Sequence, residues 1–439
     1  MRKQIYSLNL LAFLLIGISS SWSQDTIAIS EEELLSKLKG NNWELKIAEQ
    51  EYLSAKADFR QSNSLFLPEV ELSYTAITTT NPLMAFGSKL NQEILTAQDF
   101  NPALLNDPDR INNFATVISV NQPLINVDGI YQRKAAKAKM EAMEQKSIRT
   151  EKGMRLELKK TYMMLQLNYE AVKVIEEAVI MARGSVKMVE DYFNQGLVQK
   201  PDLLQAELKL QELITQQSSA KHQLQNISQQ LAYLVNDSIG NSVYSPENKL
   251  KASIESQELQ TEFPSNREDI QAMYKAAEAY ESMSKASKMN FVPRLNAFGS
   301  YQLYDDEIFQ ADADGYLVGV QLSWTLFKGY QNIATAEKSK IEFQKAQTEA
   351  EQYEAQSKME INKMGRQLIL AKQKVNQQEL SVKQAAEAYR IRKDRFSEGL
   401  EKTTDLLMAQ NQLLQEELGL LKAVFEFKTT QEYLAFLTK

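Results

Sequence analysis

The chain contains one long apolar pattern twice, and the second copy follows the first by 203 positions. In each copy an apolar residue recurs at every seventh position. These residues are Leu158, Leu165, Val172, Val179, Val186 and Phe193 in the first copy, and Ile361, Leu368, Val375, Val382, Tyr389 and Phe396 in the second. A seven-residue repeat places one apolar seam along a helix that packs lengthwise against a neighbour. We therefore expect two long helices, at about 129–194 and 330–397.

A return segment follows each of these helices and repeats the same spacing. The apolar residues Leu203, Leu210, Leu224 and Leu231 are matched by Leu406, Leu413, Phe427 and Leu434. The pattern predicts return helices at about 201–235 and 403–437, so that each copy forms a helical hairpin. The tandem repetition indicates two similar halves rather than one compact globular core.

Four other segments change to a period of two, which is typical of half-buried strands. They lie at about 70–76, 114–124, 295–303 and 316–326. We expect each whole strand to be about 10 residues long, slightly longer than some of these alternating stretches. That is the length of a tilted transmembrane β-strand, and aromatic residues lie near several of the strand ends. The alternative is a pair of soluble hairpins that cap the helices.

These elements divide the chain into ordered parts. Residues 1–23 have the basic start, apolar run and small residues of a secretory signal peptide. A first repeat at 24–235 contains a helix at 30–65, a hairpin at 67–124 and the helical hairpin 129–235. A linker at 236–264 precedes a second repeat at 265–439, with a helix at 265–290, a hairpin at 291–327 and the helical hairpin 329–437. Later apolar runs are too short to form a membrane-spanning helix.

Composition excludes several kinds of chemistry. The chain has no cysteine, which removes disulfides and thiolate metal sites. Its only histidine, His222, has no second histidine or cysteine with which to bind a metal. The formal net charge of −7, with both signs interspersed, does not predict nucleic-acid binding. We expect no enzyme activity, no catalytic residues, no metal and no cofactor.

Four membrane strands cannot form a closed barrel. Unpaired backbone groups at an open edge cost several kcal/mol each in hydrocarbon, and the smallest barrels have about eight strands. Several copies must therefore share one barrel if the strands lie in lipid. Symmetric association would also bring the helical hairpins into a ring, which predicts a conduit.

The ordered set of motifs resembles the TolC-like outer-membrane efflux proteins. The two helix turns match best: Phe193 to Val198 is followed by Asp202, and Phe396 to Leu400 is followed by Asp405. Each aspartate comes six residues after a glycine. The strand-to-helix passages with Gly129 and Gly329 are also similar to the family's.

The resemblance implies a mixed α+β membrane protein that is predominantly helical. A homotrimer would form a 12-stranded transmembrane β-barrel, with four strands from each chain, continued by a long periplasmic α-helical barrel. Its surroundings would be outer-membrane lipid, and its partners a periplasmic membrane-fusion adaptor and an inner-membrane pump. The implied function is passive passage of substrates in efflux or type I secretion.

The same resemblance assigns roles to residues at the helix turns. Asp202 and Asp405 match acidic residues that line the narrowest opening in relatives, although either could instead cap the helix that it begins. Glu401 stands where the best-known member has a basic residue, so we do not assume that member's charge link. We expect closure of this narrowest opening to depend more on packing around Phe193 and Phe396.

The solvent-facing turns are the predicted adaptor-docking surface. Its residues are Gly196, Leu197, Val198, Gly399, Leu400 and Thr403. We expect the two glycines to adopt left-handed backbone conformations, which strain other residues. The main rival interpretation is a periplasmic coiled-coil adaptor or scaffold, which would also need paired helices and an export signal.

Overall fold

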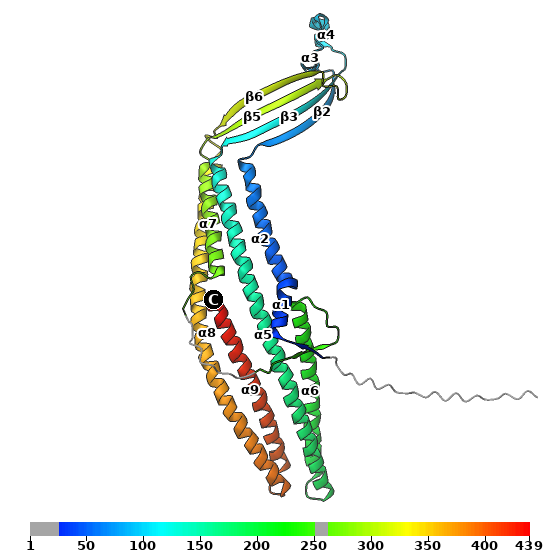
Figure 1. Cartoon of the computed structure of the whole chain (residues 1–439), viewed down its shortest axis with the longest axis vertical. Helices are drawn as coiled ribbons and strands as arrows, with labels where there is room; N and C mark the ends of the chain where they lie inside the picture. Colours follow the sequence, from blue (N-terminus) through cyan, green and yellow to red (C-terminus); the bar gives the residue numbers. More distant parts are fainter. Residues whose placement is uncertain (1–25, 251–261) are drawn as a thin grey trace, which may run out of the picture. The chain divides into compact units, whose positions relative to one another are not determined.

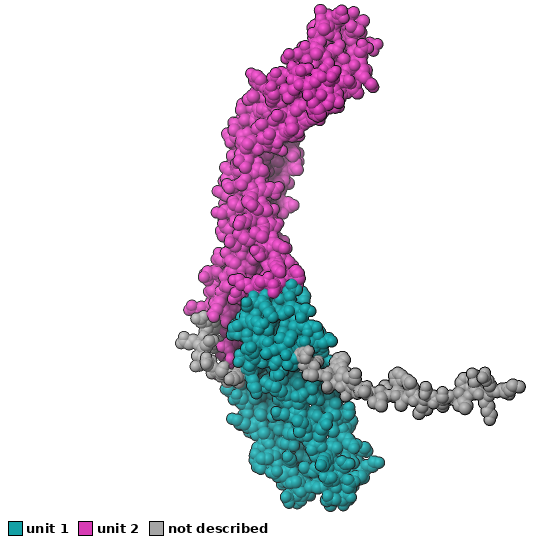
Figure 2. Space-filling view, turned by 45° about the vertical axis from the view of Figure 1, so that its right-hand side comes forward, with its two compact units in different colours: residues 1–38, 158–252, 375–425 teal, residues 39–157, 253–374, 426–439 magenta. Residues whose placement is uncertain are grey.

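The computed structural model describes residues 26–250 and 262–439, so the predicted signal peptide lies outside the described residues. The chain divides into two compact units (Figure 2). Unit 1 comprises residues 1–38, 158–252 and 375–425, and unit 2 comprises residues 39–157, 253–374 and 426–439. Three long helices have residues in both units: α5 (Val127–Asn194), α8 (Gln331–Ser397) and α9 (Thr403–Thr438).

The long helices begin and end close to the predicted positions. In unit 1, α5 turns into α6 (Lys200–Leu234), and α8 turns into α9 (Figure 1). An apolar core made of Ile175, Ala178, Val179, Ala182, Leu213 and Leu414 joins helices α5, α6 and α9. The predicted return helices are therefore confirmed as elements.

Unit 1 also contains a two-stranded parallel sheet that the sequence did not predict. Strand β1 (Thr26–Ile29) pairs with β4 (Val243–Pro246), which lies within the predicted linker 236–264. The backbone N–H of Tyr244 donates to the Ser228 hydroxyl of α6 at 3.0 Å. The Tyr162 hydroxyl of α5 donates to the carbonyl of Ile29 at 3.1 Å. Both helices thus hold the small sheet.

Unit 2 contains the four predicted strands as one antiparallel sheet. Among the described residues its order is β2-β3-β5-β6. The bounds are β2 (Glu69–Thr79), β3 (Ile111–Ile125), β5 (Arg294–Asp305) and β6 (Ala313–Ser323). Helices α2 (Trp43–Gln61) and α7 (Glu268–Met289) precede β2 and β5 in the chain.

The helix predicted at 30–65 is divided into α1 (Glu31–Asn41) and α2. Asn42 lies between them, and its side chain caps α2 by accepting from the backbone N–H of Leu45 at 3.0 Å.

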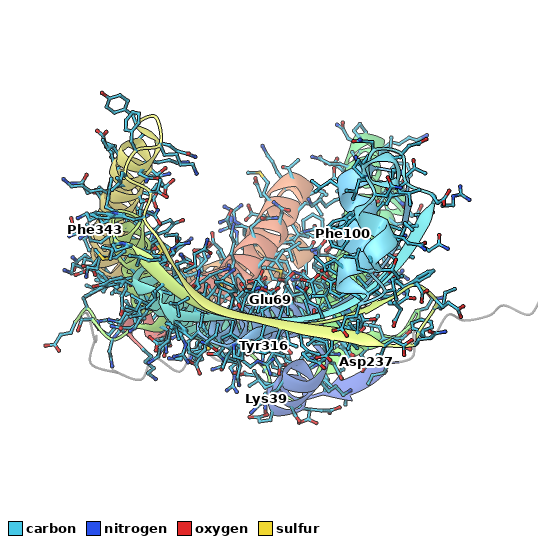
Figure 3. The ribbon with its side chains drawn as sticks, turned by 90° about the horizontal axis from the view of Figure 1, so that it is seen from above. Lys39, Glu69, Phe100, Asp237, Tyr316 and Phe343 are labelled. Atoms are coloured by element: carbon cyan, nitrogen blue, oxygen red, sulfur yellow. The ribbon has the colours of Figure 1, made fainter. Side chains whose placement is uncertain are left out.

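Strand register places apolar residues on one face of this sheet. Cross-strand partners include Val70 with Val120, Leu72 with Ile118, Tyr301 with Tyr316, and Gly299 with Val318. The opposite face carries polar residues such as Glu69, Ser119 and Ser300. Viewed from above, Tyr316 lies on the convex side of the curved sheet and Glu69 on the other side (Figure 3). The predicted alternation is therefore confirmed.

The connection between β2 and β3 contains three short helical elements. It forms α3 (Pro82–Asn91), a 3-10 turn (Ala97–Phe100) and α4 (Pro102–Asn106). Asn81 caps α3 by accepting from the backbone N–H of Met84 at 3.2 Å. The buried amide of Gln92 donates to the carbonyl of Asp305 at 2.9 Å, which holds this insertion against the sheet.

A charged cluster in unit 2 holds the end of α9. The Arg267 side chain, 1% exposed, donates to Asp269 at 2.6 Å, to the Ser357 hydroxyl at 2.8 Å and to the carbonyl of Leu437 at 2.9 Å. The Arg149 guanidinium lies 3.6 Å from the centre of the Phe436 ring. Arg149 also donates to the carbonyl of Phe436 at 3.2 Å. Two of the last carbonyls of α9 thus receive cationic donors, which suits the negative end of a helix dipole.

None of the helices in the described residues is both long and apolar enough to span a membrane.

Candidate functional site at the hairpin turns

The two hairpin turns have the same backbone geometry. Gly196 has φ +74° and Gly399 has φ +71°. The N–H of Gly196 donates to Phe193, and that of Leu197 to Tyr192, both at 2.9 Å. In the second turn the N–H of Gly399 donates to Phe396 at 3.0 Å, and that of Leu400 donates to Arg395 at 2.9 Å. These paired bonds end a helix with a left-handed residue, so the prediction for both glycines is confirmed.

An exposed leucine follows each of these glycines. Leu197 is 67% exposed and Leu400 is 68% exposed. An apolar side chain so exposed at a fixed turn is available to a partner without rearrangement of its own hairpin. Val198 is half-buried against the apolar core at the turns. Thr403 is only 2% exposed, so its side chain does not belong to this outward-facing surface.

Both turns share one apolar core. It consists of Val189 from α5, Ala206 from α6, and Phe396, Leu406 and Leu407 from the second hairpin. The Tyr192 ring lies 5.4 Å from that of Phe396, centre to centre, and the Tyr192 hydroxyl donates to the carbonyl of Ser397 at 2.8 Å. Phe396 is 1% exposed and Phe193 is half-buried. Packing around Phe396 therefore joins the two hairpins, whereas its ring does not face solvent in the single chain.

The two predicted aperture aspartates differ in what holds them. The Asp202 carboxylate accepts from the backbone N–H of Gln199 at 3.1 Å and so caps α6. The Asp405 carboxylate lies in the first turn of α9, 3.9 Å from the Arg392 guanidinium. Its side chain is 39% exposed. Both aspartates are half-buried, but Asp202 caps a helix whereas Asp405 lies beside an arginine.

Glu401 is neutralised by arginines that sequence reasoning missed. Arg395 Nε lies 2.9 Å from Glu401 Oε2, and Arg392 lies 3.4 Å from Glu401 Oε1. The Glu401 side chain is 14% exposed. Basic residues in the last two turns of α8, opposite an acidic turn residue, were the signal that could have identified this cluster. The second turn therefore has its own ion pairs, which join Glu401 to arginines of the same hairpin.

A model of the family described as "Outer membrane efflux protein" matches residues 34–237 and 261–438. The chain belongs to the outer membrane efflux protein family. Members of this family are outer-membrane channels rather than enzymes, as the sequence predicted. The chain is accordingly an outer-membrane protein. A search of curated proteins found no match.

Several solved structures of outer-membrane channels share the fold of this family member. The Campylobacter jejuni CmeC channel has a TM-score of 0.81 at 16% identity, with 93% of this chain and 85% of that chain covered. The Vibrio cholerae protein VceC has a TM-score of 0.76 at 18% identity, with coverage of 92% and 94%. The Neisseria gonorrhoeae MtrE channel, in its open state, has a TM-score of 0.73 at 14% identity, with coverage of 93% and 88%.

Proposed function

We propose that three copies of this chain form one conduit across the outer membrane. Each copy would supply its four strands to a shared 12-stranded barrel, and its helices would continue the conduit as a periplasmic α-helical barrel. Substrates would pass without energy input from an inner-membrane pump, through a periplasmic adaptor, to the outside. The system would serve efflux or type I secretion.

The observation that carries this proposal is the apolar, incomplete sheet of unit 2. Leu72, Val318 and Val320 on one face are 69%, 75% and 68% exposed. Burying apolar surface is worth about 25 cal/mol per Å², so water is an unfavourable solvent for this face. Within the described residues β2 pairs only with β3, and β6 pairs only with β5. The outer edges of β2 and β6 are therefore available to other copies.

The strand directions fit a ring of copies. Each neighbouring pair in the order β2-β3-β5-β6 is antiparallel, so β6 runs opposite to β2. A second copy placed at the β6 edge with its β2 would continue the antiparallel pattern. Every edge would be paired once the ring closes, which removes the unsatisfied backbone groups that lipid does not tolerate.

Disulfide cross-linking between copies tests the shared barrel, because the natural chain has no cysteine. One cysteine replaces Leu317 on β6, and a second replaces Glu69, Glu71, Ser73, Thr75 or Ile77 on β2. We expect one register to give a cross-linked ladder that ends at three chains. As the matched control, Leu317→Cys combined with Ser119→Cys on the central strand β3 gives no ladder. A ladder at no register would overturn the shared barrel.

Extraction from membranes separates this proposal from the alternative of a periplasmic coiled-coil adaptor or scaffold. A barrel in lipid requires detergent for release, whereas a scaffold is released by high salt. The exposed apolar sheet face favours the first outcome, since a soluble scaffold would leave it in water.

The adaptor would dock at the hairpin turns through the two exposed leucines. A photo-crosslinking residue at Leu197 or Leu400 is expected to capture a periplasmic membrane-fusion protein in living cells, identified by mass spectrometry. Leu208 on α6 is a matched control, because it is 62% exposed but lies two helical turns from the end of its helix. Equal capture from Leu208 would contradict docking at the turns.

The Asp405 carboxylates of three copies would attract cations at the narrow end of the conduit. We expect Asp405→Asn to weaken the block of single-channel current by trivalent cations. Arg392→Gln should strengthen that block, because it removes the positive charge 3.9 Å from Asp405. Block that is unchanged in both variants would refute the assigned role.

We also propose that residues 24–235 and 265–439 are tandem repeats joined by residues 236–264. The matching turns at Gly196 and Gly399, separated by 203 positions, support this. Two halves expressed together, with the chain cut between residues 250 and 262, are expected to assemble into the same channel. A cut within α5 should prevent assembly. If the two halves cut between residues 250 and 262 did not assemble, that result would contradict the division into two repeats.

A further inference from the structure

The short loop between β5 and β6 contains a strained aromatic residue. Phe309 has φ +62° and Ala311 has φ +63°, although neither is glycine. A left-handed backbone costs such residues on the order of 1–3 kcal/mol, and surrounding contacts must compensate for it. One such contact is present: the N–H of Asp312 donates to the carboxylate of Asp305 at 2.8 Å, and Asp305 is only 3% exposed. This hydrogen bond helps to hold the loop in that conformation.

This conformation directs Phe309 onto the apolar face of the sheet. Its ring stacks on that of Tyr74 with centres 4.7 Å apart, and Tyr74 stacks on Phe114 at 6.4 Å. Tyr74 and Phe114 lie on the same face as Val70 and Leu72. The aromatic stack therefore continues the apolar face to the end of the sheet where β5 meets β6.

The two large apolar residues of the loop remain exposed despite this stacking. Ile308 is 63% exposed and Phe309 is 76% exposed. The flanking residues Asp306, Glu307 and Asp312 are charged. An apolar tip between charged residues suits the boundary between lipid headgroups and acyl chains. Aromatic residues that contact both water and apolar surface are favoured there.

We infer that Ile308 and Phe309, on the Tyr74–Phe114 stack, anchor this end of the sheet in the interfacial region of the lipid bilayer. The inference rests on the proposed function, because that function places the adjoining apolar face in lipid. A second copy of the chain is less suited to cover Ile308 and Phe309. In the proposed barrel, copies join at the edges of β2 and β6, in the plane of the sheet, whereas the stacked rings lie on its face. The partner is a lipid surface rather than a protein.

Fluorescence quenching by brominated lipid tests the anchor. The full mature chain is prepared with Trp43→Phe and Trp324→Phe, and one tryptophan is then introduced as Phe309→Trp, Val318→Trp or Leu83→Trp. Each variant is placed in phosphatidylcholine vesicles that carry bromine either close to the glycerol or near the methyl ends of the acyl chains. Leu83, on α3, is the matched control, because it is 82% exposed but lies outside the apolar face.

The three probes give distinguishable outcomes. We expect loss of Phe309→Trp fluorescence mainly with bromine close to the glycerol, loss of Val318→Trp fluorescence mainly with bromine near the chain ends, and little loss from Leu83→Trp. The anchor would be overturned if Phe309→Trp fluorescence were quenched no more than that of Leu83→Trp while Val318→Trp was still quenched. That result would leave the proposed function standing. Unquenched Val318→Trp would instead overturn the proposed function.

A second measurement avoids any change to the aromatic stack. A spin label on Ile308→Cys, the only cysteine in that variant, is expected to collide more often with lipid-soluble oxygen than with a water-soluble nickel complex. The same label on Leu83→Cys should show the opposite preference. Preference for the nickel complex at Ile308 would place the loop in water and refute the anchor.

Discussion

Replacing Arg267 with alanine tests how the end of α9 is held in unit 2. The variant removes three hydrogen bonds from a guanidinium that is 1% exposed. Loss of one partner from a buried ion pair costs about 3–5 kcal/mol, because the other partner stays buried without its counter-charge. Asp269 would retain Arg149 at 3.4 Å and the Tyr353 hydroxyl at 2.8 Å. We therefore expect the lower end, about 3 kcal/mol.

Hydrogen exchange of the last two turns of α9 measures this loss directly. A loss of about 3 kcal/mol corresponds to roughly 150-fold faster exchange, at about 1.4 kcal/mol for each factor of ten. Arg390→Ala is the matched control. Arg390 also forms ion pairs, with Glu387 and Asp394, but its side chain is 62% exposed, so this variant should leave exchange in α9 unchanged. Acceleration by less than about fivefold in Arg267→Ala would refute the assignment of this cluster as the attachment of α9.

The same cluster predicts a pH dependence. Burial by itself raises the pKa of Asp269, but hydrogen bonds from Arg267 and Tyr353 and the charge of Arg149 outweigh it and lower the pKa below its ordinary value. The stability contributed by ionised Asp269 is therefore present above the unfolded-state pKa of about 3.9 and is lost as the pH falls through the folded-state pKa. The difference in exchange between the natural chain and Arg267→Ala should shrink in that acidic range.

Three further predictions concern unit 1. Gly399→Ala should destabilise the second turn by about 1–2 kcal/mol, because alanine is strained at φ +71°, and proteolysis at that turn should become faster. Phe396→Ala should cost about 3–5 kcal/mol in the core shared by the two turns and accelerate hydrogen exchange in both hairpins; acceleration in one hairpin alone would contradict their coupling. Burial and the nearby charge of Glu177 raise the pKa of Glu417, so Glu417→Gln should raise the thermal unfolding temperature at neutral pH and lose this advantage below the ordinary glutamate pKa of about 4.3.

The chemistry of the hairpin turns was only partly predictable from sequence. The left-handed glycines followed from local turn rules, because glycine alone avoids a steric penalty there. The pairing of Glu401 with Arg392 and Arg395 did not, since it depends on how the turn brings residues of α8 and the loop together. Burial of Thr403 was missed for the same reason. A site residue's exposure is a property of packing rather than of its position in a motif.

The sequence by itself determined the elements whose signal is periodic. A seven-residue repeat marked α5 and α8, and alternation marked β2, β3, β5 and β6, because both patterns record which face of a local element avoids water. Only the tertiary structure decided three other features: the parallel pairing of β1 with β4, the charged cluster around Arg267, and the stacking of Phe309 on Tyr74. Each joins residues far apart in the chain, and such contacts leave no period in the sequence.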